Sequence, residues 1–231
     1  MREFVAFSNV SKGFRNILAL KGVSFSIPGG SIAGLIGPNG AGKSTILKII
    51  GGLLPQDEGD VYIMGRRNPP FYQRARLLSY MTEGLQPYPD LKVGEFANFV
   101  SGGFEQGREY AEALGLSSVW KKRIKALSKG YTQRLKLFCA LANEKKLVVL
   151  DEPFEGFDPI QLLDILNLLK KENFMGRTFV LSTHNIGYAE RVCDYFVLLK
   201  EAEVVEEGDF EALKGRYGSS SLEEIFIKAL A

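Results

Sequence analysis

One glycine-rich segment of the chain has the residue types and the spacing that could bind phosphate. It matches the pattern G-x-x-x-x-G-K-[ST] and comprises Gly37, Pro38, Asn39, Gly40, Ala41, Gly42, Lys43 and Ser44, with Thr45 directly after it. Glycines let consecutive backbone N–H groups turn inward around an anion, and a following helix adds the positive end of its dipole. Lys43 would contact the β- and γ-phosphates, and the Ser44 hydroxyl would be a magnesium ligand. The segment therefore predicts the phosphate loop of a nucleotide-binding protein.

Two adjacent acidic residues follow an apolar run and could complete the chemistry. The run of residues 147–150 is typical of a buried strand, and Asp151 and Glu152 come directly after it. At the carboxyl end of such a strand, beside the phosphate loop, Asp151 would hold the water shell of a magnesium ion. Glu152 would polarise a water molecule for attack on the γ-phosphate. Taken alone, the same pattern also fits a strand that merely ends in two solvated acids.

The segments around these residues indicate how they are positioned. Short apolar runs rich in β-branched residues alternate with helical patterns, which is typical of α/β proteins. Residues 32–36 read as a buried strand that leads into the glycine-rich loop, and residues 44–50 read as the helix after it. This order favours a phosphate loop over a chance match to the pattern. Further strands are predicted over residues 4–10, 23–27, 147–150, 178–181 and 195–199.

The middle of the chain, about residues 84–142, has a helical pattern that is interrupted by proline and glycine pairs. Helices are predicted over residues 93–100, 108–114 and 132–142, and a last helix over residues 222–230. We interpret the middle as a helical insertion in the α/β core and not as a second domain. The expected organisation is one domain over residues 1–231, with a helical subdomain at about 84–142 and a C-terminal tail at about 207–231.

The composition restricts the classes of function. With 29 basic and 27 acidic residues the net charge is +2, so the chain lacks the strong basic balance that nucleic-acid binding favours. No apolar run approaches the roughly 18 residues of a membrane-spanning helix, and the first residues do not resemble a secretion signal. The two cysteines, Cys139 and Cys193, stand in apolar stretches and are expected to be free thiols in a reducing cytoplasm.

A segment before the acidic pair carries a family resemblance. Residues 127–135 read Leu-Ser-Lys-Gly-Tyr-Thr-Gln-Arg-Leu and resemble the signature of ATP-binding cassette (ABC) ATPases, Leu-Ser-Gly-Gly-Gln followed by a basic helix. Ser128 and Gly130 match that signature, whereas Lys129 and Tyr131 replace its first glycine and its glutamine. The resemblance implies that Ser128 and Gly130 cap the γ-phosphate of ATP bound by another subunit. In isolation, Ser128 would more simply be the N-cap of an ordinary helix.

Four further positions match this family in chain order. Phe14 resembles the aromatic residue that stacks on adenine, and Asp158, in Phe-Asp-Pro, resembles the D-loop aspartate at the dimer interface. His184 ends a predicted strand, like the family histidine that contacts the γ-phosphate. Glu83 stands where the family usually has a glutamine that touches magnesium. A core or surface role remains an alternative for Phe14, and metal ligation by Glu83 is left open.

The resemblance, which covers about residues 3–210, implies an α/β P-loop NTPase fold of the ABC ATPase type, with an N-terminal antiparallel β subdomain and the helical insertion. It implies ATP and Mg²⁺ as ligands and a homodimer or heterodimer of ABC ATPases around two ATP molecules. The dimer would drive transport by membrane-spanning permease subunits from the cytoplasmic face of the membrane, and nucleic acid is not expected as a partner.

Within this family, residues 88–93 (Tyr-Pro-Asp-Leu-Lys-Val) are similar to a segment of ATPases that serve type-2 exporters. This similarity favours export, while the permease would determine the transported substrate. Two alternatives are a soluble ABC ATPase that acts on DNA or ribosomes, and a regulatory switch that binds ATP but hydrolyses it slowly. Intact Glu152 and His184 argue against the switch.

Overall fold

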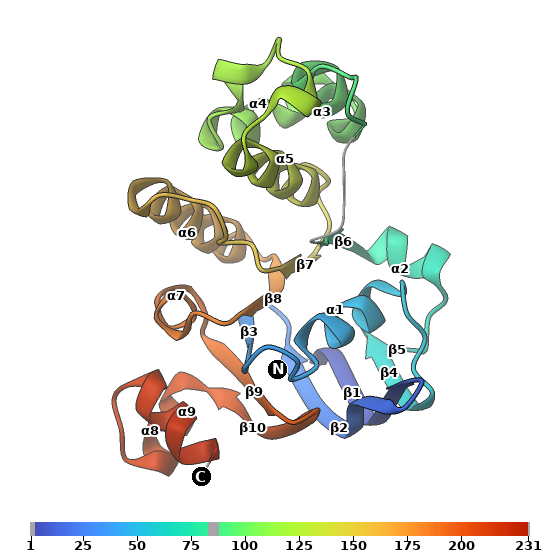
Figure 1. Cartoon of the computed structure of the whole chain (residues 1–231), viewed down its shortest axis with the longest axis vertical. Coiled ribbons are helices and arrows are strands. Elements are labelled where there is room, and N and C mark those ends of the chain that lie inside the picture. Colours follow the sequence, from blue (N-terminus) through green and yellow to red (C-terminus); the bar gives the residue numbers. More distant parts are fainter. Residues whose placement is uncertain (1–2, 83–87, 231) are drawn as a thin grey trace.

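The computed structural model describes residues 3–82 and 88–230. Its strands form two sheets, and a group of helices extends beyond one edge of the larger sheet (Figure 1). The larger sheet has the strand order β10-β9-β3-β8-β7-β6, in which β10 is antiparallel to β9 and all other neighbours are parallel. Its strands are β3 (Ile32–Ile36), β6 (Leu78–Met81), β7 (Leu147–Asp151), β8 (Thr178–Thr183), β9 (Tyr195–Lys200) and β10 (Glu203–Asp209). The strands β3, β7 and β8 are buried along their whole length because helices or the second sheet cover both faces.

The smaller sheet has the strand order β2-β1-β4-β5, and each pair of neighbouring strands is antiparallel. It consists of β1 (Glu3–Phe14), β2 (Ile17–Pro28), β4 (Glu58–Ile63) and β5 (Arg66–Arg67). The first two strands form a long hairpin, in which alternate side chains of β1 such as Val5 and Phe7 are buried. This alternation is expected of a sheet that packs on a core with one face.

Helix α1 (Lys43–Gly51) packs in the core that the two sheets share. Its side chains Ile46, Leu47, Ile49 and Ile50 are fully buried and belong to one cluster with residues of β1, β2, β3 and β7. On the opposite face of the larger sheet lie α6 (Pro159–Phe174) and α7 (Ile186–Val192) (Figure 1). Because β3 runs directly into the loop before α1, the larger sheet places that loop at its carboxyl edge.

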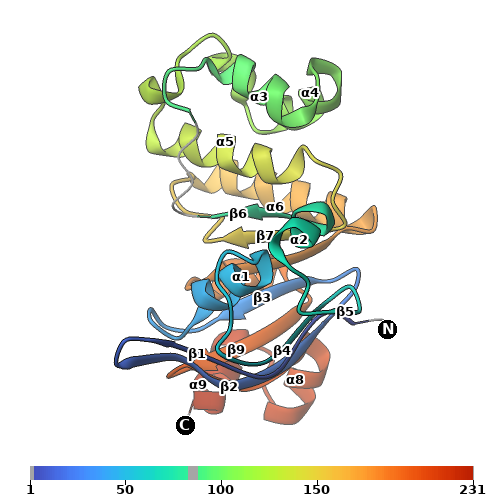
Figure 2. The ribbon, with the colours of Figure 1, turned by 90° about the vertical axis from the view of Figure 1, so that its right-hand side faces the viewer.

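Apart from α2, the remaining helices lie at the two ends of the molecule (Figure 1). One group consists of α3 (Val93–Ser101), α4 (Phe104–Ala113), the 3-10 turns η1 (Leu116–Val119) and η2 (Ile124–Ala126), and α5 (Lys129–Leu141). Figures 1 and 2 both show this group beyond the edge strand β6, with the antiparallel sheet at the other end of the molecule. Helix α2 (Phe71–Leu77) precedes β6, and α8 (Phe210–Tyr217) and α9 (Leu222–Leu230) close the described chain.

The fold class predicted from the sequence is confirmed, and so are most of the predicted elements. The strand at residues 32–36 and the helix at 222–230 have the predicted bounds, whereas the first hairpin extends well beyond residues 4–10 and 23–27. Helices α2, α6, α7 and α8 and strands β4, β5, β6 and β10 were not predicted. Both cysteines are free, with Cys193 buried and Cys139 half-buried. Among the described residues, we find no helix with the length and apolar character needed to traverse a bilayer.

Candidate nucleotide-binding site

The glycine-rich loop lies between β3 and α1 and has a backbone that requires its glycines. Gly40 and Gly42 adopt φ angles of 84° and 104°, in the left-handed region that residues with a Cβ avoid. Gly37 has a second constraint, because a Cβ at this position would lie 2.5 Å from the carbonyl oxygen of Leu199. Ala41 is buried beneath the loop and Pro38 is exposed. The loop is therefore packed tightly at Gly37 and exposed in its middle, and its backbone shape depends on the glycines of the sequence pattern.

The ammonium group of Lys43 lies against the loop itself. Its Nζ donates hydrogen bonds to the carbonyl oxygens of Gly37, at 2.7 Å, and Pro38, at 3.0 Å. Burial lowers the pKa of Lys43, and the negative charges of Glu152 and Asp151 oppose that lowering. A buried cation between backbone carbonyls and two carboxylates can exchange one of these contacts for a phosphate oxygen.

Ser44 and Asp151 meet at the start of α1 and the end of β7. The Ser44 hydroxyl donates to Asp151 Oδ1 at 3.1 Å, and Ser182 Oγ donates to the same oxygen at 2.7 Å. Asp151 is 2% exposed. A hydroxyl and a carboxylate that converge in this way are the hard oxygen donors that Mg²⁺ prefers, so the residues fit this ion. Glu83, the third predicted metal contact, lies outside the described residues.

Glu152 is held by contacts to both its backbone and its side chain. Its φ angle is 46°, which is uncommon for a residue other than glycine. The Glu152 N–H donates to Ser182 Oγ at 3.0 Å, and the carboxylate Oε2 lies 3.2 Å from Nδ1 of His184. Burial raises the pKa of the Glu152 carboxyl, while the hydrogen bond and charge of His184 and the charge of Lys43 oppose the rise. A carboxylate with a raised pKa is better suited to accept a proton than an ordinary glutamate.

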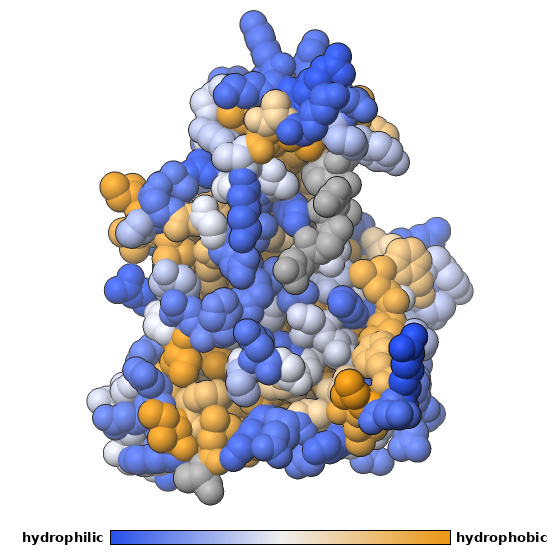
Figure 3. Space-filling view, viewed as in Figure 1, coloured by the Kyte–Doolittle hydropathy of each residue, from blue (hydrophilic) through white to orange (hydrophobic). Residues whose placement is uncertain are grey.

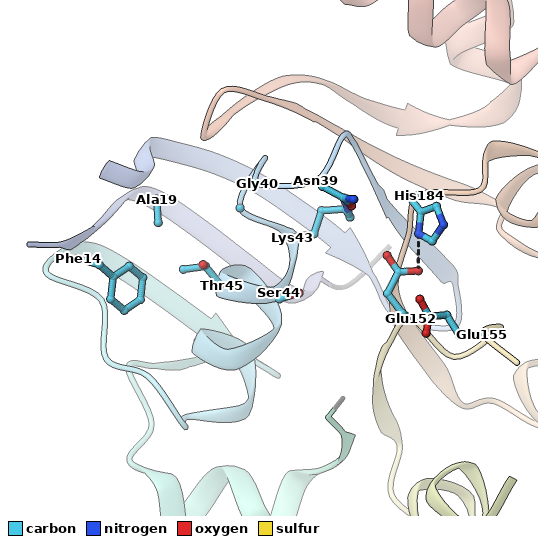
Figure 4. Close-up of a pocket in the computed structure, with 11 residues that line it drawn as sticks. Phe14, Ala19, Asn39, Gly40, Lys43, Ser44, Thr45, Glu152, Glu155 and His184 are labelled. Atoms are coloured by element: carbon cyan, nitrogen blue, oxygen red, sulfur yellow. Dashed lines mark hydrogen bonds and ion pairs between the residues drawn. The ribbon is translucent and has the colours of Figure 1, made fainter. Parts of the chain in front are cut away.

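Lys43, Ser44, Glu152 and His184 line one cavity of about 480 Å³. Figure 4 shows Lys43 and the loop facing Glu152 and His184 across it, with Phe14 at the far end. The lining residues are Phe14, Ala19, Asn39, Gly40, Gly42, Lys43, Ser44, Thr45, Glu152, Glu155 and His184. The structure thus brings together residues that are separated by more than a hundred positions in the sequence. Glu155 was not predicted, although its place between Glu152 and Asp158 could have suggested it.

Phe14 ends strand β1 at the tip of the first hairpin. Its side chain is 46% exposed and the ammonium of Lys12 lies 5.7 Å from the ring centre. Asp57 anchors this tip, because its carboxylate accepts hydrogen bonds from Lys12 Nζ at 2.5 Å and from the backbone N–H of Gly13 at 2.8 Å. An exposed aromatic ring at one end of a phosphate-binding cavity can stack on a flat base.

Several predicted residues are not among the lining residues of this cavity, namely Gly37, Pro38, Ala41 and Asp151, which lie next to it in the loop and at the end of β7, and Ser128, Gly130 and Asp158, which lie elsewhere. Ser128 is exposed at the start of α5, where its Oγ accepts the N–H of Tyr131 at 3.4 Å, and Gly130 follows it in the first turn. Asp158 caps α6 by accepting the N–H groups of Ile160 and Gln161 at 3.0 and 2.9 Å. Both side chains therefore act as helix caps within this chain. Their predicted contacts with another subunit stay predictions.

Comparison with known proteins agrees with this geometry. Residues 20–155 match the model of the ABC transporter family. The lantibiotic transport ATP-binding protein SrtF of Streptococcus pyogenes is 30% identical over 94% of this chain and 93% of its own length. The Nod factor export ATP-binding protein I of Sinorhizobium fredii is 35% identical over 90% of this chain and 64% of its own length.

Solved structures give the same result. An ATP-binding subunit of an ABC transporter superposes with a TM-score of 0.89 at 28% identity, over 99% of this chain and 100% of the other. A dimeric ATP-binding cassette in a post-hydrolysis state with ADP and phosphate superposes with a TM-score of 0.79 at 29% identity, over 89% of this chain and 98% of the other. The protein belongs to the ABC transporter family and is an ATP-binding cassette that hydrolyses ATP.

Proposed function

We propose that the cassette works as a dimer around two ATP molecules, in the presence of Mg²⁺, and powers export through membrane-spanning permease subunits. The observation that carries this proposal is the arrangement of the cavity. The loop, Glu152 and His184 line it from one chain, whereas Ser128 and Gly130 lie outside it at the exposed start of α5. A second cassette, either another copy or a similar ATPase, would supply that turn to each site.

The residues of the cavity have separate tasks in hydrolysis. The loop amides and Lys43 would bind the phosphates, and Phe14 would stack on the base. Glu152 would accept a hydrogen bond from the attacking water and orient it in line with the γ-phosphate. His184, 3.2 Å from the Glu152 carboxylate, would keep that carboxylate facing the cavity. Ser44 and Asp151 would hold the magnesium ion, which neutralises phosphate charge when it is bound.

The start of α5 has features that suit a γ-phosphate from a second chain. The first N–H groups of a helix attract anions, and the Lys129 side chain beside them is 82% exposed and carries a positive charge. Closure of two cassettes would press this turn against the phosphate that Lys43 of the other chain binds. Hydrolysis would remove the γ-phosphate that links the two chains, and the dimer would open. The bound nucleotide would therefore determine whether the dimer is closed or open.

Exposed apolar side chains support a membrane-protein partner at the cytoplasmic face of the membrane. Leu53, Phe71 and Tyr72 are each more than half exposed, and they lie where the ends of α1 and α2 meet. Figure 3 shows hydrophobic surface on the side where Figure 1 labels α2. Phe99 on α3 is 79% exposed. Large exposed apolar groups are typical of protein interaction sites, and the names of the relatives favour transport over the DNA- or ribosome-linked alternative.

The hydrolytic assignment is tested by Glu152→Gln. We expect turnover at saturating Mg-ATP to fall by about 10²- to 10⁴-fold, because the variant cannot accept a proton, while binding of a fluorescent ATP analogue is retained. The matched control is Glu211→Gln, which changes an exposed glutamate on α8 that pairs with Lys214 and lies far from the cavity in the sequence. Turnover of Glu152→Gln at the wild-type rate would show that another group activates the water.

A further inference from the structure

The orientation of Glu152 depends on groups that hold its backbone. A φ angle of 46° places it in the left-handed region, which a residue with a side chain occupies only where the surrounding structure enforces it. The Glu152 N–H is bound by Ser182 Oγ, from β8 in the same sheet. The opposite group, the Glu152 carbonyl oxygen, accepts a hydrogen bond from Gln133 Nε2 at 3.0 Å. The two contacts fix both peptide groups that flank the Glu152 Cα.

The contact from Gln133 comes from a different part of the fold than the contact with Ser182. Gln133 belongs to α5, in the helical region that lies beyond β6, and not to the sheet that carries Glu152. It stands in the second turn of the helix that begins with Ser128 and Gly130. The side chain of Gln133 is half-buried, so water competes only partly for its hydrogen bond.

The space between α5 and the residues at and after the end of β7 is not completely filled by side chains. A cavity of about 360 Å³ lies between them, beside the Gln133 contact. Thr132, Gln133 and Lys136 line it from the helix. Asp151, Glu152 and Glu155 line its other side. Lys129 and Glu155, which also line this cavity, form an ion pair at 3.3 Å, but both side chains are substantially exposed. Since exposed ion pairs hold geometry weakly, the Gln133 contact is the better-placed restraint on Glu152.

We propose that Gln133 is a positioning residue for hydrolysis, which holds the backbone of Glu152 in its left-handed conformation and ties that conformation to the place of α5. This role rests on the proposed assignment of Glu152 as the group that orients water. The side-chain amide acts through the Glu152 carbonyl oxygen, and Gln133 is not among the residues that line the nucleotide cavity. Any shift of α5 relative to β7 would displace the Glu152 carbonyl group. Because the Glu152 side chain is attached to the same Cα, its carboxylate would then point in a different direction.

The chemistry of the contact requires a neutral donor of this length. Methionine has nearly the shape of glutamine but no N–H, so it would leave a partly buried carbonyl without a donor. Glutamate has the same shape but would place a second negative charge beside Glu152. A displaced base loses alignment with its water, and misplacement of about 1 Å can cost around 100-fold in rate.

The test compares Gln133→Met with Gln73→Met, the same change on α2, in the complete chain. We expect Gln133→Met to lower kcat by about tenfold or more while KM for Mg-ATP stays at the wild-type value and the thermal unfolding midpoint falls only slightly, since a single hydrogen bond is lost. Gln73→Met should change none of the three. In the Glu152→Gln background, adding Gln133→Met should cause no further loss, because the group that Gln133 positions is already disabled.

A wild-type kcat in Gln133→Met would overturn the proposal. So would a loss of kcat that comes with an equally large rise in KM and a strongly lowered unfolding midpoint, because that combination indicates general structural damage. A further loss of tenfold in the Glu152→Gln background would also overturn it. Failure of the proposed function has a separate signature, since Glu152→Gln itself would then hydrolyse ATP at the wild-type rate.

Discussion

The phosphate loop and the turn at the start of α5 are both short glycine-containing segments that precede a helix, yet they differ in how the chain holds them. The loop is packed on its own sheet, and a Cβ at Gly37 would lie 2.5 Å from a backbone oxygen. The α5 turn is exposed at Ser128 and Lys129, and a Cβ at Gly130 would lie 3.0 Å from the Gly156 carbonyl oxygen. The chain therefore fixes the backbone of the phosphate loop through its own contacts, whereas it leaves the α5 turn exposed, as expected if a second chain covers that turn.

The largest expected difference between the two regions comes from adding one methyl group to each. Gly37→Ala forces a backbone clash, so we expect the loop to distort and binding of a fluorescent ATP analogue to the isolated chain to fall more than tenfold, with a loss of about 1–3 kcal/mol in stability. Gly130→Ala, where the neighbour needs to give only slightly, should bind the analogue normally. Equal losses in both variants would contradict the contrast between the two regions.

A smaller effect concerns the pH dependence of turnover. Burial raises the pKa of the Glu152 carboxyl above its ordinary 4.5. The active, ionised form therefore accumulates only as the pH rises through this raised pKa. In a plot of kcat against pH, we expect the midpoint of the acidic limb to lie above 4.5. His184→Gln removes a group that opposes the rise, so the midpoint should move to still higher pH in the residual activity. A shift to lower pH would show that His184 does not stabilise the ionised carboxylate.

The smallest effect is expected at the exposed ion pair between Lys129 and Glu155. Lys129→Ala should change the free energy of unfolding, measured by chemical denaturation, by less than about 1 kcal/mol, because solvent screens such pairs. Nucleotide binding by the isolated chain should be unchanged. A loss of more than about 2 kcal/mol would mean that the α5 turn is held by its own chain as firmly as the phosphate loop is.

Local patterns in the sequence predicted the fold class and the phosphate loop because both depend on local physics. A continuous apolar run such as Ile32–Ile36 can only be a strand buried on both faces or a short buried helix, and the glycines that follow it restrict the choice. By contrast, β4 and β10 are partly exposed strands with polar residues, such as the acidic run in β10, so periodicity did not reveal them.

The parts of the site that the sequence did not predict depend on contacts between distant segments. Nothing in the order of residues indicates that Glu152 has a positive φ, or that an amide from α5 reaches its carbonyl oxygen. The anchoring of the Phe14 hairpin by Asp57 is also long-range. Conversely, a helix-cap role for Ser128, which the sequence offered as the simpler alternative, is present in the structure, and its role toward a second nucleotide stays a prediction.

The central claim, that each ATP is completed by the α5 turn of a second chain, is tested most directly by the mass of the Glu152→Gln variant in solution. Light scattering after size exclusion should give twice the monomer mass with saturating Mg-ATP and the monomer mass without it, and Ser128→Ala in the same background should weaken the dimer. A variant that remains monomeric with Mg-ATP, both alone and together with the products of its neighbouring genes, would contradict the account.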